Sequence, residues 1–298
     1  MRGGRPERAV RYRTGPDFCF VPPHDGETLR AKQIDSCSYA LFGGLVQQMV
    51  SSVVDTIRTR YSEPLRLDDL ASAAFVSKFH LLRTFHKQTN ITPGRFLAAV
   101  RLQEAKRMLY VTSLNVANIA TQVGYSSTGS FTRRFTDAVG LSPIRYRRMS
   151  RGQRFDFTHT GRSASWCEGA RVTGVVSTPH PIASPIFVGA FDSPILQGEP
   201  RASTLLAEPG PFEICGLPCG RWYFHAVALR PGETAPSELD PEAPMLAGCV
   251  GPVLHIDRGL RKVPSDLVLT PPEPTDPPIL FARLGLAPAA DAHSDDQR

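Results

Sequence analysis

The sequence contains no run of 18 apolar residues; its most apolar stretch, residues 39–46, is interrupted by Gly43 and Gly44. A membrane-spanning helix needs about 20 apolar residues, so a membrane span is excluded. No apolar segment follows the basic N-terminus, which argues against a secretory signal. Six cysteines in 298 residues, without paired spacing, do not form a disulfide framework. We therefore expect a reducing, cytoplasmic location.

Acidic residues and prolines are scarce in the middle of the chain. Residues 47–151 contain 16 Lys and Arg, six Asp and Glu and three prolines, whereas residues 152–298 contain 11 Lys and Arg, 17 Asp and Glu and 20 prolines. Long helices tolerate only the lower proline density, and a basic segment favours a polyanionic partner, most simply nucleic acid. We expect an irregular lead over 1–45, an all-α domain over 46–150, short strands over 151–286 and a disordered tail over 287–298.

The helical segment contains an internal repeat with a spacing of 50 residues. Residues 81–85 (LLRTF) align with 131–135 (FTRRF), and residues 91–96 (ITPGRF) align with 141–146 (LSPIRY). Several matches at one spacing are typical of repeated supersecondary units. Helical spacing of apolar residues predicts two helix–turn–helix units, at 67–89 and 116–138, and a connector helix over 94–110.

In each unit the second helix has a candidate N-cap and an apolar inner face. Ser77 is expected to cap the first of these helices, and Ser126 or Ser127 the second. Apolar pairs four residues apart, such as Leu81 and Phe85, pack inward and leave a cationic outer surface. A helix–turn–helix places its second helix in the major groove of DNA, so two units on one connector could enter adjacent groove segments.

Five short motifs occur in order within residues 50–150: Leu81-x-Arg83-x-Phe85, Arg101-x3-Ala105, Gly124-Tyr125-Ser126, Phe131-x-Arg133-x-Phe135 and Gly140-Leu141-Ser142-Pro143-x2-Tyr146-Arg147. With these motifs the segment resembles the DNA-binding domain of AraC/XylS-type transcription regulators. The resemblance covers about a third of the chain. It implies double-stranded DNA as the partner, with base contacts from Phe79, Leu82, Arg83, Thr128, Gly129, Thr132 and Arg133.

These base-reading candidates differ in chemistry. Arg83 and Arg133 suit bidentate contacts to guanine, whereas Leu82 offers only apolar contact, for example to a thymine methyl group. Gly129 has no side chain with which to read a base. Phe79 has an alternative role in the core, because Leu81 and Phe85 define a different helix face.

Contacts to the DNA backbone are expected from basic side chains and helix caps. Arg101 is instead expected to brace the connector helix, and the Arg145–Arg151 cluster has an alternative as an ordinary solvated surface. The candidates are Ser77, Lys78, Lys87, Ser127, Arg134, Arg145, Arg147 and Arg148, together with Arg95 and Arg151.

The C-terminal part predicts an antiparallel β-sandwich. Expected strands lie at 172–176, 186–191, 212–214 and 222–228, separated by proline and glycine turns. Residues 211–223 resemble the hairpin of prealbumin-like or carboxypeptidase-regulatory-like sandwiches. We expect this domain to sense a small-molecule effector, to mediate self-association or to contact RNA polymerase; the oligomeric state stays open.

No pattern indicates catalysis, a metal or a cofactor. Cys215 and Cys219 lack a second ligand pair, and the eight histidines are scattered. A sequence-specific transcription regulator without enzymatic activity is therefore expected. One alternative is a DNA-alkylation repair protein with a cysteine methyl acceptor, but Cys19 and Cys37 stand alone and no Pro-Cys-His-Arg segment occurs. Another is a partner-binding sandwich for which DNA is secondary.

Overall fold

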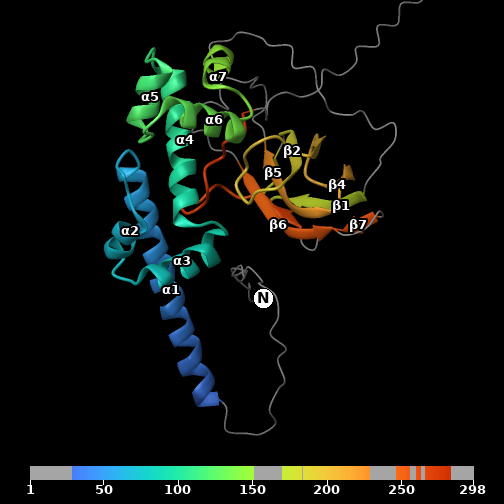
Figure 1. The fold of residues 1–298 in the computed structure, drawn as a ribbon. Coiled ribbons are helices and arrows are strands. Elements are labelled where there is room, and N and C mark those ends of the chain that lie inside the picture. Colours follow the sequence, from blue (N-terminus) through green and yellow to red (C-terminus); the bar gives the residue numbers. More distant parts are fainter. Residues whose placement is uncertain are drawn as a thin grey trace, which may run out of the picture. The chain divides into compact units, whose positions relative to one another are not determined.

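The computed structural model describes residues 29–150, 170–182, 184–228, 246–255, 260–262 and 266–282 (Figure 1). Contacts divide the chain into two units, Met1–Leu45 and Val46–Arg298. The two expected domains on either side of residue 151 therefore belong to one compact unit. Arg151, Cys19 and the expected tail at 287–298 lie outside the described residues.

Seven helices are described, and both expected helix–turn–helix units and the connector are present. The first unit consists of α2 and α3, the second of α5 and α6, and the connector is α4. The structure differs from expectation at residues 29–45, which belong to a helix instead of an irregular lead, because no proline occurs between Pro23 and Pro64 and glycines only weaken a helix. The helices are α1 (Leu29–Arg60), α2 (Leu67–Ala73), α3 (Lys78–Thr89), α4 (Pro93–Val111), α5 (Val116–Gln122), α6 (Thr128–Val139) and α7 (Pro143–Ser150). No described helix is long and apolar enough to cross a bilayer.

Side-chain caps fix where these helices begin. The Ser77 hydroxyl accepts a hydrogen bond from His80 N at 3.3 Å, and Ser127, not Ser126, accepts one from Ser130 N at 3.2 Å. Thr92 caps α4 in the same way at 3.3 Å. Each cap satisfies a backbone donor that the first helical turn leaves unpaired.

The helical core is built on aromatic side chains. Phe85, Phe96, Phe131, Phe135 and Tyr146 are fully buried. Phe85 meets Phe96 edge-on at 5.7 Å between ring centroids, and Phe135 meets Tyr146 at the same distance. The repeat therefore places equivalent aromatic contacts behind α3 and α6, on the inward faces that the apolar spacing predicted.

The C-terminal region is β-rich, with two four-stranded sheets. One sheet has the order β4-β1-β7 with β8 also paired to β1, and the other has the order β3-β2-β5-β6. Most pairs are antiparallel, but β7 and β8 run parallel to β1, which corrects the expected purely antiparallel arrangement. The four expected strands are present. The strands are β1 (Ala170–Ser177), β2 (Ile186–Phe191), β3 (Ala202–Leu206), β4 (Pro211–Leu217), β5 (Gly220–Ala228), β6 (Ala247–His255), β7 (Leu260–Lys262) and β8 (Leu267–Val268).

Residues 211–223 do not form the expected hairpin. β4 pairs with β1, whereas β5 pairs with β2 and β6, so the chain passes from one sheet to the other between them. Near the end of β4, just before this connection, Gly216 has φ 76°, a backbone conformation that glycine adopts without strain. Two strands joined by a tight turn can pair with each other or belong to different sheets. The local sequence pattern is the same in both cases.

Segments of the C-terminal region complete the helical core. Ile195, Leu280 and Ala282 are buried in the same hydrophobic cluster as the helices. The last residues of α6 are hydrogen-bonded by two of these segments: Gly198 N donates to Ala138 O at 2.6 Å, and Ala282 N donates to Val139 O at 3.2 Å. The end of α6 is thus bound to the β-rich region.

Candidate nucleic-acid interface

The two helix–turn–helix units contain the same backbone turn. In the first, Phe75 N donates to Ser72 O at 3.1 Å and Val76 N to Ala71 O at 3.1 Å. In the second, Gly124 N donates to Thr121 O at 3.0 Å and Tyr125 N to Ala120 O at 2.9 Å. The residues at the bend, Phe75 and Gly124, both have positive φ, at 55° and 85°. Each unit therefore orients its second helix in the same way relative to its first.

The first reading helix presents its candidates to solvent. Arg83 is exposed, Leu82 is half-buried, and the Phe79 side chain is 75% exposed. Leu81 and Phe85 are fully buried on the opposite side. The alternative assignment of Phe79 to the core is therefore wrong.

The second reading helix has smaller side chains. Thr128, Gly129 and Arg133 are exposed and Thr132 is half-buried. A Cβ at Gly129 would meet nothing within 4 Å, so no packing constraint accounts for this glycine. Arg133 Nε lies 3.9 Å from Asp137, and both side chains are largely exposed. An exposed ion pair of this length is weak, so Arg133 can reorient.

The basic side chains expected to contact the DNA backbone differ in their interactions within the protein. Lys78 lies 3.4 Å from Asp68, and Arg95 donates to the Ser193 hydroxyl at 3.1 Å. Arg147 donates to the carbonyl oxygens of Leu109 and Leu114, so it holds α7 to the end of α4; this corrects its assignment to the DNA backbone. The other basic candidates, Lys87, Arg134, Arg145 and Arg148, are exposed.

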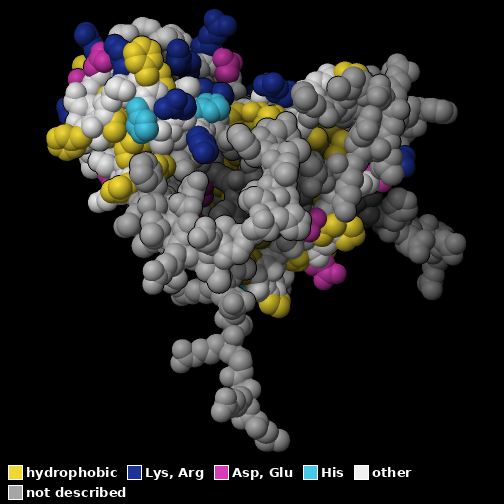
Figure 2. Space-filling model, turned by 90° about the horizontal axis from the view of Figure 1, so that it is seen from below, with side chains coloured by type: hydrophobic (Ala, Val, Ile, Leu, Met, Phe, Trp, Pro, Cys, Tyr) yellow, Lys and Arg dark blue, Asp and Glu magenta, His cyan; other side chains and the backbone are white. Residues whose placement is uncertain are grey.

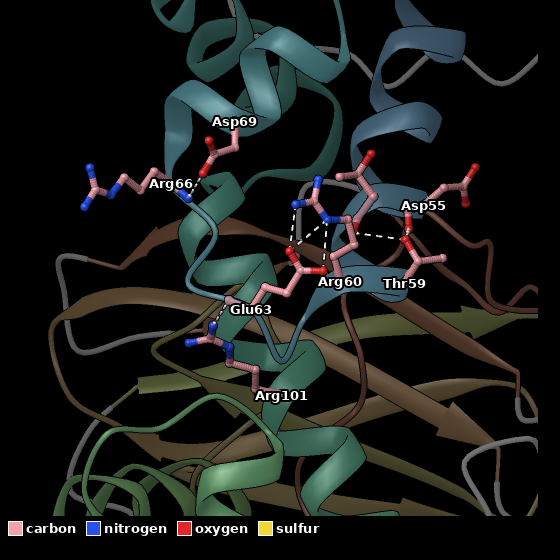
Figure 3. A network of polar contacts seen from close by, with 8 residues as sticks. Asp55, Thr59, Arg60, Glu63, Arg66, Asp69 and Arg101 are labelled. Carbon is pink, nitrogen blue, oxygen red and sulfur yellow. Dashed lines mark hydrogen bonds and ion pairs between the residues drawn. The ribbon is translucent and has the colours of Figure 1, made fainter.

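Arg101 braces the helical unit, as its place on the connector predicted (Figure 3). It donates to Tyr61 O and Glu63 O, each at 2.7 Å, and its guanidinium lies 6.0 Å from the centre of the Tyr125 ring. Burial lowers the pKa of Arg101, and burial raises that of Tyr125. A Cβ at Gly124 would come within 2.9 Å of this guanidinium and 2.7 Å of Ser62 O. Arg101 thus connects the loop before the first unit to the turn of the second.

The loop that Arg101 holds is fixed by further polar contacts (Figure 3). Arg60 and Glu63 form an ion pair at 2.7 Å, and the hydrogen bond from Arg60 lowers the pKa of Glu63. Arg66 N donates to the Asp69 carboxylate at 2.7 Å at the start of α2. The entry to the first unit is therefore specified by local contacts.

The connector sets the separation of the two reading helices. Figure 1 shows α3 and α6 near opposite ends of α4. Nineteen residues make α4 about 28 Å long. Successive major-groove segments on one side of DNA are about 34 Å apart. The connector is thus about 6 Å shorter than this repeat.

Cationic and apolar side chains are interspersed on one face of the molecule. Figure 2 shows Lys, Arg and His side chains close to exposed hydrophobic side chains there. Elsewhere in the helical region, Phe75 is 96% exposed, although the sequence indicated only a turn. The one signal that could have singled it out is its alignment with Gly124. Among the described residues, no group of three His, Cys, Asp or Glu is placed to bind a metal.

Comparisons with known proteins identify the helical segment. A helix-turn-helix domain family matches residues 70–149. The chain is 33% identical over 104 residues to the HTH-type transcriptional activator AarP of Providencia stuartii, which covers 35% of this chain and 77% of AarP. It is 29% identical over 103 residues to the lactose operon transcription activator of Staphylococcus xylosus, covering 35% of this chain and 37% of that protein. It is 32% identical over 104 residues to the bifunctional transcriptional activator/DNA repair enzyme AdaA of Bacillus subtilis, covering 35% and 49%.

These similarities are confined to part of each protein. The chain spans little more than a third of the length of several regulators that it matches. The matched lengths are about those of α2 to α7 with their flanks.

Proposed function

Because the chain belongs to the AraC-type helix-turn-helix transcription regulators, we propose that it binds a specific double-stranded DNA site and regulates transcription there, without enzymatic activity. The observation that carries this proposal is the pair of helix–turn–helix units with one turn geometry on one connector helix. Relatives named as activators favour activation.

We propose that α3 and α6 read bases in adjacent major-groove segments. Arg83 and Arg133 would each make a bidentate contact to guanine, because both side chains are exposed on the outer face. Phe79 and Leu82 would contact thymine methyl groups. In the second unit, Thr128 and Thr132 would contact bases through hydroxyl groups on short side chains. Gly129 would let the helix approach the base edges closely.

Phosphate contacts would orient the protein on the duplex. Basic side chains gain affinity by releasing counterions from DNA and carry little sequence information. The N-termini of α3 and α6, capped by Ser77 and Ser127, suit phosphates because their backbone N–H groups point outward. The basic contributors would be Lys78, Lys87, Arg134, Arg145 and Arg148.

Selection from a random DNA pool with the full chain tests the proposal. We expect one recovered site, bound with strong salt dependence, and a footprint over two major-groove segments about one helical turn apart. Protection confined to half a turn, or no recovered site, would contradict the proposal.

The C-terminal region is proposed to regulate this binding. We infer that its two sheets form a β-sandwich, because Val172 and Phe212 from one sheet share a hydrophobic cluster with Val188 and Phe224 from the other. Effector binding, self-association or contact with RNA polymerase would reach the DNA-binding helices through Gly198 and the other segments bound to α6. Repeating the selection with candidate metabolites tests the first role, and the sedimentation coefficient tests the second.

Two proteins test whether the C-terminal region regulates DNA binding: a chain that ends at residue 151, and the variant Arg95→Ala. Unchanged DNA affinity, association state and promoter response in both would contradict a regulatory role. The truncated chain must first be shown to retain its helical circular dichroism, because Ile195 and Leu280 belong to the helical core.

A repair activity is the second candidate, favoured by the similarity to AdaA. Transfer of a methyl group from alkylated DNA to any cysteine of this chain, seen as a mass increase in the intact protein, would support it. We expect no such transfer, because the similarity is explained by the shared helix-turn-helix segment.

A further inference from the structure

Phe75 combines strong exposure with an unfavourable backbone conformation. It is the most exposed of the large hydrophobic side chains in the described part of the chain, at 96%. Its φ is 55°, in the left-handed region that is unfavourable for residues other than glycine, asparagine and aspartate. Among the described residues, no aromatic stacking or cation–π contact involves Phe75. The fold therefore gains nothing evident from this ring.

The second unit shows that the turn itself does not call for an aromatic residue. Gly124 occupies the same place, with the same pair of backbone hydrogen bonds, at φ 85°. There a Cβ would come within 2.7 Å of Ser62 O, so the second turn is closed to side chains. The first turn is open to solvent. The first turn thus carries a ring where glycine would fit the backbone better, and such strain is typical of functional sites.

The position of Phe75 decides which partner it would contact. It lies two residues before Ser77, the N-cap of α3, and close in sequence to Phe79, which is 75% exposed. Two residues span at most about 7 Å of backbone, so the ring lies beside the end of α3 that enters the groove. Lys78 follows three residues later, and residues 47–151 contain 16 Lys and Arg against six Asp and Glu. An exposed apolar ring in a basic segment suits DNA, whose groove walls present apolar sugar carbons beneath anionic phosphates.

We propose that Phe75 is a further DNA contact of the first unit and selects thymine at the edge of the first half-site, the DNA segment that α3 would contact. The ring packs on deoxyribose carbons of the groove wall and on a thymine methyl group, extending the apolar contacts of Phe79 and Leu82. This inference rests on the proposed function, because it requires α3 to lie in the major groove. It makes the first half-site richer in thymine than the second, where Gly124 offers no side chain.

Two variants separate the ring from the backbone strain. Phe75→Gly and Phe75→Asn both suit a positive φ and remove the ring. We expect each full-length variant to bind the selected DNA site about five- to tenfold more weakly, as loss of apolar burial implies. The slope of affinity against salt concentration stays unchanged, because no charge is removed. The temperature of half-unfolding stays the same or rises, because the strain is gone. Tyr110→Ala, which removes a 37% exposed aromatic side chain at the far end of α4, serves as the matched control and leaves DNA affinity unchanged.

Site selection supplies the second readout. Selection with Phe75→Asn should lose the preference for thymine at one position of the first half-site and keep the other preferences. If both variants bind the selected site as tightly as the wild-type chain, the proposal is overturned, and the ring then serves a protein partner or nothing. If the wild-type chain selects no DNA site at all, the proposed function fails, and this inference fails with it.

Discussion

The two helix–turn–helix units share one backbone design but are supported differently. The first unit has an open turn between its two helices, and Phe75 in this turn and Phe79 in α3 are exposed to solvent. In the second, Gly124 lies against Ser62 O and Arg101, and the end of α6 is hydrogen-bonded by Gly198 and Ala282. The comparison shows that two copies of one motif can differ in their surroundings. The first unit exposes large side chains, whereas the second is bound to the rest of the molecule.

The β-rich region is attached to the two units unequally. A change in the β-rich region reaches the second reading helix directly, since two of its segments bind the last residues of α6. Among the described residues, the region's polar contacts near the first unit are to the flanking helices: Arg95 at the start of α4 donates to Ser193, and Arg58 of α1 donates to Pro274 O. We therefore expect disturbance of the C-terminal region to affect α6 more than α3.

The largest effect is expected from Leu280→Ala. Leu280 is fully buried in the helical cluster, so the substitution leaves a cavity and lowers the free energy of unfolding by about 3 kcal/mol. Urea unfolding measures this loss, and backbone amide exchange should accelerate more in α6 than in α3. Val111→Ala, at a 57% exposed position, is the control and should change stability little. Equal acceleration in both helices would remove the asymmetry between the units.

A pH titration tests the hydrogen bond between His225 and Ser193, the residue that also binds Arg95. His225 Nε2 donates to Ser193 O at 2.9 Å, and burial lowers the pKa of His225 to about 4. Between pH 6.5 and 4 the unfolded chain binds a proton at this side chain that the folded chain does not. The free energy of unfolding therefore falls as pH falls through this range, by about 3 kcal/mol at pH 4. His225→Gln should lose that part of the pH dependence; the same pH profile in both proteins would show that His225 is not its source.

Adding one methyl group to the second turn should cost more than removing the ring from the first. Gly124→Ala places a Cβ 2.7 Å from Ser62 O at φ 85°, which lowers the free energy of unfolding by about 2 kcal/mol. Phe75→Gly at the equivalent place should cause no loss. Thermal unfolding of the two variants side by side checks the contrast. A stable Gly124→Ala variant would mean that the second turn is as open as the first.

The smallest effects are expected for single base contacts. Arg83→Ala and Arg133→Ala should each relax the preference at one base pair by about 1.5 kcal/mol, without changing stability. Binding to a panel of single-base variants of the selected site measures this. A uniform loss on every site would instead mean that the arginine contacts a phosphate. The two arginines should relax different half-sites, about one helical turn apart.

Local patterns were sufficient for the helices and their caps. The apolar spacing and the Ser77 cap predicted α3, and the connector expected over 94–110 differs by one residue at each end from α4. Four strands were also predicted from short apolar runs. The inward aromatic residues followed from spacing, because a residue four positions along a helix lies on the same face.

Other features depend on contacts between distant residues. Arg147 has the composition of a phosphate ligand, yet its guanidinium binds carbonyls 38 and 33 residues away. The segment 211–223 has the pattern of a hairpin, yet its two strands find partners in different sheets. The exposure of Phe75 could not be read from the sequence, because an aromatic residue in a turn is as compatible with burial.

Three local signals determined that this protein has two helix–turn–helix units joined by a connector helix: apolar periodicity, capping residues and the duplicated motif. Each of these signals acts within a few helical turns. Only the tertiary structure decided which side chains remain available to a partner and that the β-rich region is bound to one of these units. The exposure of a side chain and the contact between the β-rich region and α6 both depend on segments that are far apart in the sequence. No local pattern carries that information.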